Sequence, residues 1–249
     1  MPSGYEDSSN SRPLILIVDD EPDLITLLKK LFEREQYKVA TARDGEEAIW
    51  VLRRGIGQGH RILVILDLML PVRTGFELCQ FIRSNTELRG TPILAISAQA
   101  GTEVKVRALE DGADDFMEKP FSSRELLARV NALVRRCQKV DSRDMQPIRF
   151  SFGPLVVDTQ RREVLLEGIE ISLTRLEFQI LHYFILHQGV VVRKDELVEV
   201  LWDESDPVGD DNLKVHVHAL RRKLGDQANK PRFIETLRGF GYRFKNKPD

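Results

Sequence analysis

Three acidic residues and one lysine in the first half of the chain each follow an apolar run, and together they could support phosphoryl chemistry. Asp19 and Asp20 come directly after one run, and Asp67 comes after a second. Lys119 follows a third, weaker run. Mg²⁺ prefers hard oxygen ligands, a carboxylate can act as a nucleophile, and an ammonium group can pair with phosphate oxygens. These side chains are therefore candidates for a site that binds Mg²⁺ and a phosphoryl group.

The elements that must position these residues follow from the hydrophobic spacing. Short runs of β-branched and aliphatic residues predict buried parallel strands, and apolar residues at intervals of three and four predict helices between them. We expect strands at about 14–18, 38–41, 62–66, 92–97 and 115–117. We expect helices at about 22–35, 45–53, 75–84, 104–111 and 123–136. This alternation predicts a doubly wound α/β domain, whose ligands bind beyond the carboxyl ends of the strands.

Each of these residues also has a simpler interpretation. An aspartate after a strand is more often a helix cap than a ligand, and a lysine before a proline is ordinarily a loop residue. Ser97, at the end of the fourth strand, adds a hydroxyl that can donate to a phosphoryl oxygen. Because the simpler interpretation must account for suitable chemistry at four strand ends at once, the joint pattern favours the phosphoryl site.

Four motifs carry this pattern: VDDE at 18–21, DLMLP at 67–71 with Gly75, SA at 97–98 and GADDFMEKPF at 112–121. In this order and spacing, residues 13–136 resemble the receiver domain of bacterial two-component response regulators. The resemblance implies the flavodoxin-like strand order 2-1-3-4-5. It implies that a sensor histidine kinase phosphorylates Asp67 and that Lys119 binds the phosphoryl group. It also implies an Mg²⁺ cofactor held by Asp19, Asp20, Asp67 and the backbone carbonyl of Met69.

Two further residues are implied to respond to the phosphorylated state. By resemblance, Ser97 moves toward the phosphoryl group and Phe116 turns inward to fill the space that Ser97 leaves. Phe116 stands where this subfamily usually has tyrosine, so the outward hydrogen bond of a phenol is lost while inward packing of the ring is kept. The alternative, that Phe116 is simply a core residue, is equally open.

The second half of the chain differs in pattern and in charge. Short strands with alternating apolar residues, a helix at 174–188, a helix at 212–224 and a hairpin at 233–244 predict an α+β domain. From residue 158 to 211 there are five Lys/Arg and thirteen Asp/Glu, whereas from 212 to 249 there are ten Lys/Arg and three Asp/Glu. A basic final segment can present a positive face to nucleic acid, although a solvated surface is the simpler interpretation.

The helix at 212–224 has small and hydrogen-bonding residues on the side opposite its apolar face. Such a face suits the major groove of DNA, with flanking cations on the phosphates. An ordinary amphipathic surface helix is the alternative. The expected DNA contacts on this helix and on the hairpin are Asn212, Lys214, Val215, His218, Arg221, Arg222 and Arg238.

Further motifs in this half are FGPL at 152–155, LT at 173–174, EF at 177–178 and LRGFGYRF at 237–244. With them, the segment from about 150 to 245 resembles the winged-helix domain of OmpR/PhoB-type regulators. The resemblance implies that the helix at 212–224 recognises double-stranded promoter DNA and that Arg238, on the wing, reaches the minor groove. Ala219 occupies an outward position where some relatives carry a base-reading arginine, so no sequence preference is carried over.

The same resemblance implies that the receiver dimerises through its fourth helix, fifth strand and fifth helix. Opposite charges stand where a symmetric interface needs them. The expected pairs are Lys105 with Glu125, Asp115 with Arg129, and Asp111 with Arg136. We expect phosphorylation to favour the homodimer and thereby to tighten binding to paired DNA half-sites.

The expected parts of the chain are a disordered leader at 1–12, a receiver domain at 13–137, a linker at 138–149 and a winged-helix domain at 150–246. No apolar run approaches the length of a membrane span, and the leader lacks the apolar core of a signal peptide. Cys79 and Cys137 are far apart in the chain and suit a reducing compartment better than a disulfide framework. We therefore expect a cytoplasmic protein with no membrane partner.

Other functions stay open at this point. A phosphohydrolase that used Asp67 as nucleophile would usually need a second acid two residues later, where this chain has Met69. A constitutive DNA-binding protein would use the first domain only as a dimerisation scaffold, which the complete set of acids, serine and lysine argues against. The loop at 203–211 has five acids in nine residues. It is either a contact for RNA polymerase or, as the favoured alternative, a solvated loop that caps the next helix.

Overall fold

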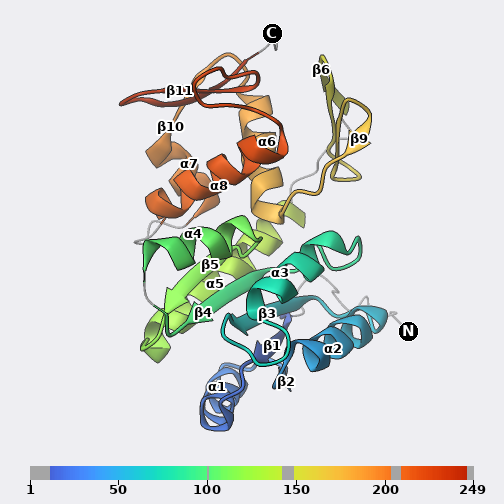
Figure 1. Ribbon diagram of the computed structural model, residues 1–249, viewed down its shortest axis with the longest axis vertical. Coiled ribbons are helices and arrows are strands. Elements are labelled where there is room, and N and C mark those ends of the chain that lie inside the picture. The colour runs from blue at the N-terminus through green and yellow to red at the C-terminus, as the bar shows by residue number, and fades with distance from the viewer. Residues whose placement is uncertain (1–11, 100, 142–148, 203–208, 246–249) are drawn as a thin grey trace, which may run out of the picture.

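The computed structural model describes residues 12–99, 101–141, 149–202 and 209–245, which form two domains stacked along the vertical axis of Figure 1. The strands of the first domain are β1 (Leu14–Val18), β2 (Val39–Ala42), β3 (Ile62–Asp67), β4 (Ile93–Ser97) and β5 (Asp115–Glu118). Its helices are α1 (Pro22–Arg34), α2 (Gly45–Gly57), α3 (Gly75–Ser84), α4 (Thr102–Glu110) and α5 (Ser123–Asp141). All five strands are parallel, in the order β2-β1-β3-β4-β5. The doubly wound, flavodoxin-like fold expected from the sequence is confirmed.

The central strands of this sheet are covered on both faces, which is why their sequences are almost continuously apolar. Ile15 belongs to one core cluster, whereas its neighbour Leu16 belongs to another on the opposite face. All six residues of β3 are buried. Burial of each large aliphatic side chain stabilises the fold by roughly 1.5–3 kcal/mol. The carboxyl ends of β1 and β3, where Asp19 and Asp67 lie, are therefore held in fixed positions.

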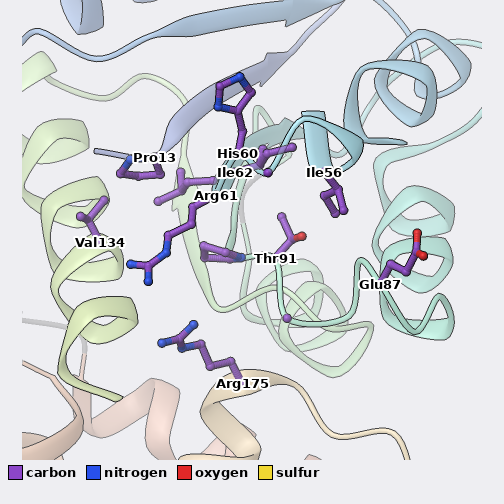
Figure 2. A pocket seen from close by; sticks show the side chains of 13 residues that line it. Pro13, Ile56, His60, Arg61, Ile62, Glu87, Thr91, Val134 and Arg175 are labelled. Atoms are coloured by element: carbon purple, nitrogen blue, oxygen red, sulfur yellow. The ribbon is translucent and has the colours of Figure 1, made fainter. Parts of the chain in front are cut away.

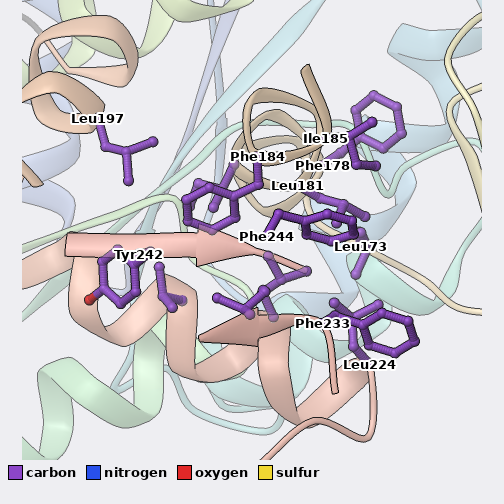
Figure 3. Close-up of a cluster of buried hydrophobic side chains, with 14 of the residues drawn as sticks. Leu173, Phe178, Leu181, Phe184, Ile185, Leu197, Leu224, Phe233, Tyr242 and Phe244 are labelled. Atoms are coloured by element: carbon purple, nitrogen blue, oxygen red, sulfur yellow. The ribbon is translucent and has the colours of Figure 1, made fainter. Parts of the chain in front are cut away.

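The second domain contains a four-stranded sheet ordered β6-β7-β8-β9 and a three-stranded sheet ordered β10-β12-β11. Its strands are β6 (Arg149–Phe152), β7 (Leu155–Asp158), β8 (Glu163–Leu166), β9 (Ile169–Glu170), β10 (Val191–Arg193), β11 (Ile234–Leu237) and β12 (Gly241–Phe244). Its helices are α6 (Arg175–Leu186), α7 (Lys194–Leu201) and α8 (Gly209–Lys223). Phe152 and Phe244 join the two sheets, with ring centroids 4.9 Å apart. Figure 3 shows Phe184, Phe244 and their neighbours closing this core, and the α+β architecture is confirmed.

Some boundaries differ from those expected from the sequence. The helix α5 continues to Asp141, into the segment expected to be a linker, and β6 already includes Arg149. No glycine or proline follows Ser123 until Pro147, so no helix breaker ends α5 earlier. The short strand β10 is set by pairing with β12, which a three-residue pattern cannot reveal. Residues 1–11 of the expected leader and 142–148 of the expected linker lie outside the described residues.

Candidate phosphoryl-acceptor site and DNA interface

The four residues expected to carry phosphoryl chemistry meet at the carboxyl edge of the first sheet. The Nζ atom of Lys119 lies 2.8 Å from Oδ2 of Asp19 and 2.5 Å from Oδ2 of Asp67. Carboxylate oxygens of Asp19, Asp20 and Asp67 lie within 4.8 Å of one another. Within the described ranges, they form the one group of three or more side chains that could hold a metal ion. Such a set of hard oxygens fits a cation like Mg²⁺.

Burial sets the charge balance of this cluster. Desolvation raises the pKa of Asp19 above its ordinary value, although Lys119 and a backbone N–H lower that pKa in part. Burial alone would lower the pKa of Lys119, but hydrogen bonds to Asp19 and Asp67 outweigh it and raise the pKa. Lys119 is therefore held as a cation. The charge of Asp19 is costly to maintain, so the cluster is suited to take up further positive charge.

Backbone groups fix the orientation of both carboxylates. The N–H of Glu21 donates to Oδ1 of Asp19 at 2.9 Å, and the N–H of Met69 donates to Oδ1 of Asp67 at 2.7 Å. In each carboxylate, Oδ1 thus accepts a backbone hydrogen bond, and Oδ2 accepts a hydrogen bond from Lys119. Met69, whose carbonyl is expected to bind the metal, lies two residues after Asp67 in the loop that follows β3.

The start of α3 packs directly against the backbone that carries Asp67. Thr74 and Glu77 form a capping box at this helix start. The N–H of Gly75 donates to the carbonyl of Leu68 at 3.1 Å. A Cβ atom at Gly75 would lie 2.2 Å from the carbonyl oxygen of Asp67. Gly75 therefore lets α3 approach the backbone of Asp67 closely, a role that its presence in the sequence motif did not specify.

Ser97 and Phe116, the two residues expected to respond to phosphorylation, are both buried. Ser97 is fully buried at the end of β4, and its Oγ accepts a hydrogen bond from the N–H of Gln99 at 3.0 Å. Phe116, on the neighbouring strand β5, is 4% exposed. It belongs to the core cluster against which Val215 of α8 packs. Their movement on phosphorylation stays a prediction.

The helix expected to read DNA, α8, lies against α4 of the first domain (Figure 1). Nδ2 of Asn212 donates to Oδ1 of Asp115 at 2.9 Å. Nη1 of Arg222 donates to Oε2 of Glu110 at 3.0 Å. Ala219, between these two contacts on the helix, is fully buried. Part of the face expected to enter a major groove, at Asn212 and Val215, thus contacts another part of the same chain, whereas His218 and Arg222 on that face stay largely exposed.

A second row of contacts joins the two domains beside the first. Nη1 of Arg89 donates to Oε1 of Glu170 at 2.6 Å, and the hydroxyl of Ser172 donates to the carbonyl of Arg83 at 3.0 Å. Arg83 is itself buried and bonded to the carboxylate of Asp114 at 2.9 Å. We call this state, with α8 against α4 and β5, the closed arrangement.

The remaining residues expected to contact DNA differ in their exposure to solvent. Lys214 is exposed on α8, and Arg238 is exposed at the turn between β11 and β12. Arg221 is buried, and its Nη2 donates to the carbonyl of Ile234 and to the hydroxyl of Thr236, both at 2.7 Å. The structure thus gives Arg221 a packing role between α8 and β11 rather than the phosphate contact expected from its flanking position.

Two features of these surfaces were missed by the sequence reasoning. Phe240 is 72% exposed beside the wing turn, and its place between two glycines was a usable signal. Glu110 pairs with Arg222 and lies 3.6 Å from Nε2 of His218. No local pattern could have assigned Glu110 this role, because its partners lie in the other domain.

Residues expected to pair across a dimer have partners inside the chain. Arg129 donates to Asp115 and to Glu125, both at 3.0 Å. The guanidinium of Arg136 lies 5.1 Å from the ring centroid of Trp202, in the second domain. The pairings with a second copy stay predictions, and in the closed arrangement α8 covers part of that face.

A pocket of about 420 Å³ lies away from the acidic edge, between the first domain and Arg175 at the start of α6 (Figure 2). Residues near the amino ends of the strands, such as Pro13, Arg61 and Thr91, line it. Among its described lining residues, Glu87 is the one acid. The pocket therefore lacks the carboxylate cluster that phosphoryl chemistry would use.

Two family models match the chain in succession. The model described as "Response regulator receiver domain" matches residues 15–131, and the model described as "Transcriptional regulatory protein, C terminal" matches residues 168–244. A solved structure of a RitR mutant has a TM-score of 0.77 at 22% identity and covers 94% of this chain and 99% of that one, which shows a shared fold. In the part of the chain that the structure describes, no helix is both long and apolar enough to cross a membrane.

Curated relatives align over nearly the whole chain. The chain is 37% identical to the alkaline phosphatase synthesis transcriptional regulatory protein PhoP of Bacillus subtilis, over 93% of this chain and 96% of that protein. It is 34% identical to the DNA-binding dual master transcriptional regulator RpaA of Synechocystis sp., over 92% and 94%. It is 35% identical to the DNA-binding response regulator MtrA of Mycolicibacterium smegmatis, over 93% and 96%.

Replacement of Gly75 by alanine should impair phosphoryl uptake on Asp67, because the added methyl group must displace the Asp67 backbone. We expect the free energy of unfolding to fall by roughly 1–3 kcal/mol, the usual cost of overpacking. Denaturant unfolding and phosphate incorporation from acetyl phosphate measure the two effects. Gly57→Ala is the matched control, since no atom lies within 4 Å of its added Cβ. Normal stability and normal incorporation in Gly75→Ala would contradict this role.

Affinity for Mg²⁺ should fall as the pH is lowered through the pKa of Asp19. That pKa is raised in the folded protein, so protons compete with the cation at a higher pH than for an ordinary aspartate. Titration calorimetry at several pH values should show weaker binding and increasing proton release toward acid pH. Asp19→Asn should weaken binding and flatten this dependence, whereas Asp23→Asn, exposed on α1, should do neither. A flat profile in the wild-type protein would remove Asp19 from the ligand set.

Proposed function

Because this chain belongs to the OmpR/PhoB-type response regulators, we propose that it is a DNA-binding transcriptional regulator controlled by phosphorylation of Asp67. The phosphoryl donor is a sensor histidine kinase in the cytoplasm, and the output is binding of a homodimer to promoter DNA. The observation that carries the proposal is the contact of Lys119 with Asp19 and Asp67 at the carboxyl edge of the sheet.

The phosphoryl step assigns a role to each residue of the site. A carboxylate oxygen of Asp67 attacks the phosphorus of a phosphohistidine, forming a P–O bond as the P–N bond breaks and the imidazole leaves with its electron pair. Mg²⁺, when held by Asp19, Asp20, Asp67 and the carbonyl of Met69, neutralises charge on the phosphoryl oxygens. Lys119 exchanges a carboxylate partner for a phosphoryl oxygen, and its raised pKa keeps it cationic.

The closed arrangement supplies the inactive state. Because Val215 of α8 packs on the core of the first domain and Asn212 bonds to Asp115, α8 cannot lie in a major groove and against α4 at the same time. Phosphorylation acts by changing Ser97 and Phe116 and thereby the surface of α4 and β5 on which α8 rests. A shift from 1:99 to 99:1 needs a difference of about 5.5 kcal/mol between the two states.

Opening also makes the dimer face available. Asn212 of α8 binds Asp115, which is one of the residues expected to face Arg129 of a second copy. Dimerisation through this face therefore follows release of α8. Two linked DNA modules then gain effective concentration on paired half-sites.

A phosphohydrolase function receives less support. Met69 places a thioether two residues after Asp67, where a phosphohydrolase would place its general acid. We therefore propose no turnover of external substrates. The expected contact of loop 203–211 with RNA polymerase stays a prediction, since residues 203–208 lie outside the described residues.

Acetyl phosphate with Mg²⁺ should convert the wild-type protein to a dimer and tighten its binding to DNA. Asp67→Ala should stay monomeric and bind weakly under the same conditions, because it has no acceptor carboxylate. Light scattering and a fluorescence-anisotropy titration with promoter DNA measure the two properties. If both proteins bind equally well under all conditions, a constitutive DNA-binding function replaces the one proposed.

Glu110→Arg should tighten DNA binding without any phosphorylation, because it replaces the partner of Arg222 with a like charge. The pair is partly exposed, so we expect a gain of about 3–10-fold in affinity in the Asp67→Ala background. Glu103→Arg adds the same charge to an exposed position at the start of α4 and is the matched control. Equal affinities of the two variants would show that the closed arrangement does not restrain α8.

A further inference from the structure

His216 is a titratable side chain buried where the two domains meet. His216 is fully buried, and neither nitrogen of its ring has a well-formed hydrogen bond among the described residues. Its ring centroid lies 6.1 Å from that of Trp202, at the end of α7. The phosphoryl site does not use this histidine, and it was not among the expected DNA contacts.

The charges that act on His216 are mostly positive. Burial is the largest cause that lowers its pKa, to about 3, and the guanidinium of Arg136 on α5 is the next. Lys223 on α8 and Arg83 on α3 lower the pKa further, whereas a backbone group of Asp114 raises it. An imidazolium at this position would therefore be both desolvated and repelled.

The nearby carboxylates are already engaged with other cations. Asp114, between α4 and β5, binds Arg83 at 2.9 Å. Glu177, on α6, binds Lys223 at 2.6 Å. Asp115, on β5, is shared by the side chains of α5 and α8 described above. Protonation of the histidine would thus add a charge that these acids do not neutralise.

We propose that His216 is a proton-sensitive latch of the closed arrangement: the neutral ring packs between the domains, and the protonated ring drives them apart. This regulation acts on the same α8 surface as the proposed function and rests on it. Arg136, Arg83 and Asp114 all belong to the first domain, so separation hydrates the ring and removes two of its three cationic neighbours.

The direction follows from the linkage between protonation and opening. A hydrated imidazole has an ordinary pKa of 6.5, whereas in the closed arrangement the pKa of His216 is about 3. Because the pKa is depressed on closing, the closed arrangement has its full stability above pH 6.5 and loses stability as the pH falls. Between pH 7.5 and pH 5.5 the ratio of closed to open molecules should fall about tenfold.

His218 opposes this effect, but weakly. Its Nε2 lies 3.6 Å from Oε1 of Glu110, so protonated His218 would favour the closed arrangement. Its side chain is 70% exposed, and solvent screens such a pair. The response to acid is therefore set by His216, and His218 serves as an internal reference on the same helix.

The first test is an NMR titration of the five histidines in the full-length, unphosphorylated protein, with His216 assigned by comparison with His216→Gln. We expect the apparent pKa of His216 to lie well below the ordinary value of 6.5. An ordinary pKa near 6.5 for His216 in the wild-type protein would overturn the proposal.

The second test measures opening itself by small-angle X-ray scattering at pH 7.5 and 5.5. The double variant Glu110→Arg with Arg89→Glu reverses a charge in each row of domain contacts and brings both states into measurable range. We expect this protein to be more extended at pH 5.5. Adding His216→Leu should abolish the difference, whereas adding His218→Gln should preserve it.

Two results would overturn the latch: no pH response in the double variant, or the same response with and without His216. Neither test uses DNA or a phosphoryl donor. The outcomes of both tests are therefore independent of the outcome of the phosphorylation experiment. A failure of Asp67→Ala to change activity would remove the proposed function and leave the scattering result standing.

Discussion

The outer face of α8 is the constraint on which the proposed regulation depends, because it can be buried against α4 or against DNA but not both. Its contacts are suited to exchange. The carboxylate of Asp115 is buried and bonded to Arg129 within its own domain, as well as to Asn212 of α8. Removing the only partner of a buried charge costs about 3–5 kcal/mol, whereas loss of one hydrogen bond among several costs about 1 kcal/mol. When α8 separates from the first domain, the charge of Asp115 therefore stays paired with Arg129.

The strand β5 connects this contact with the phosphoryl site. Asp115, which holds α8, is its first residue, and Lys119 directly follows its last. Its partner strand β4 ends at Ser97, which pairs with the residue just before Lys119. In the proposed function, a change in how Ser97 and Lys119 contact a phosphoryl group therefore acts on a strand only four residues long. The other end of that strand carries the domain contact, so the two sites are linked by packing rather than by a long path.

The cluster of acids and lysine was predictable from the sequence, and the domain contact was not. Apolar runs fix the strands, and parallel strands bring Asp19, Asp67 and Lys119 to one edge, so local patterns were sufficient. Helical periodicity likewise separates the apolar face of α8 from its outer face. It cannot show what covers the outer face, because Glu110 lies in another domain. Nor does it show that Arg221 turns inward, because its partners on β11 are set by tertiary packing.

The closed arrangement explains why a small residue stands at position 219. Some relatives carry a base-reading arginine at this position, yet here the residue is fully buried. An arginine there would need to be buried without a partner, at a cost of several kcal/mol, so it would hold the domains apart. A small neutral residue permits the closed arrangement, and base contacts are then left to residues at the two ends of the outer face of α8. Arg222 meets both demands because it stands at the edge of the contact, 54% exposed, where it can exchange the carboxylate of Glu110 for a phosphate.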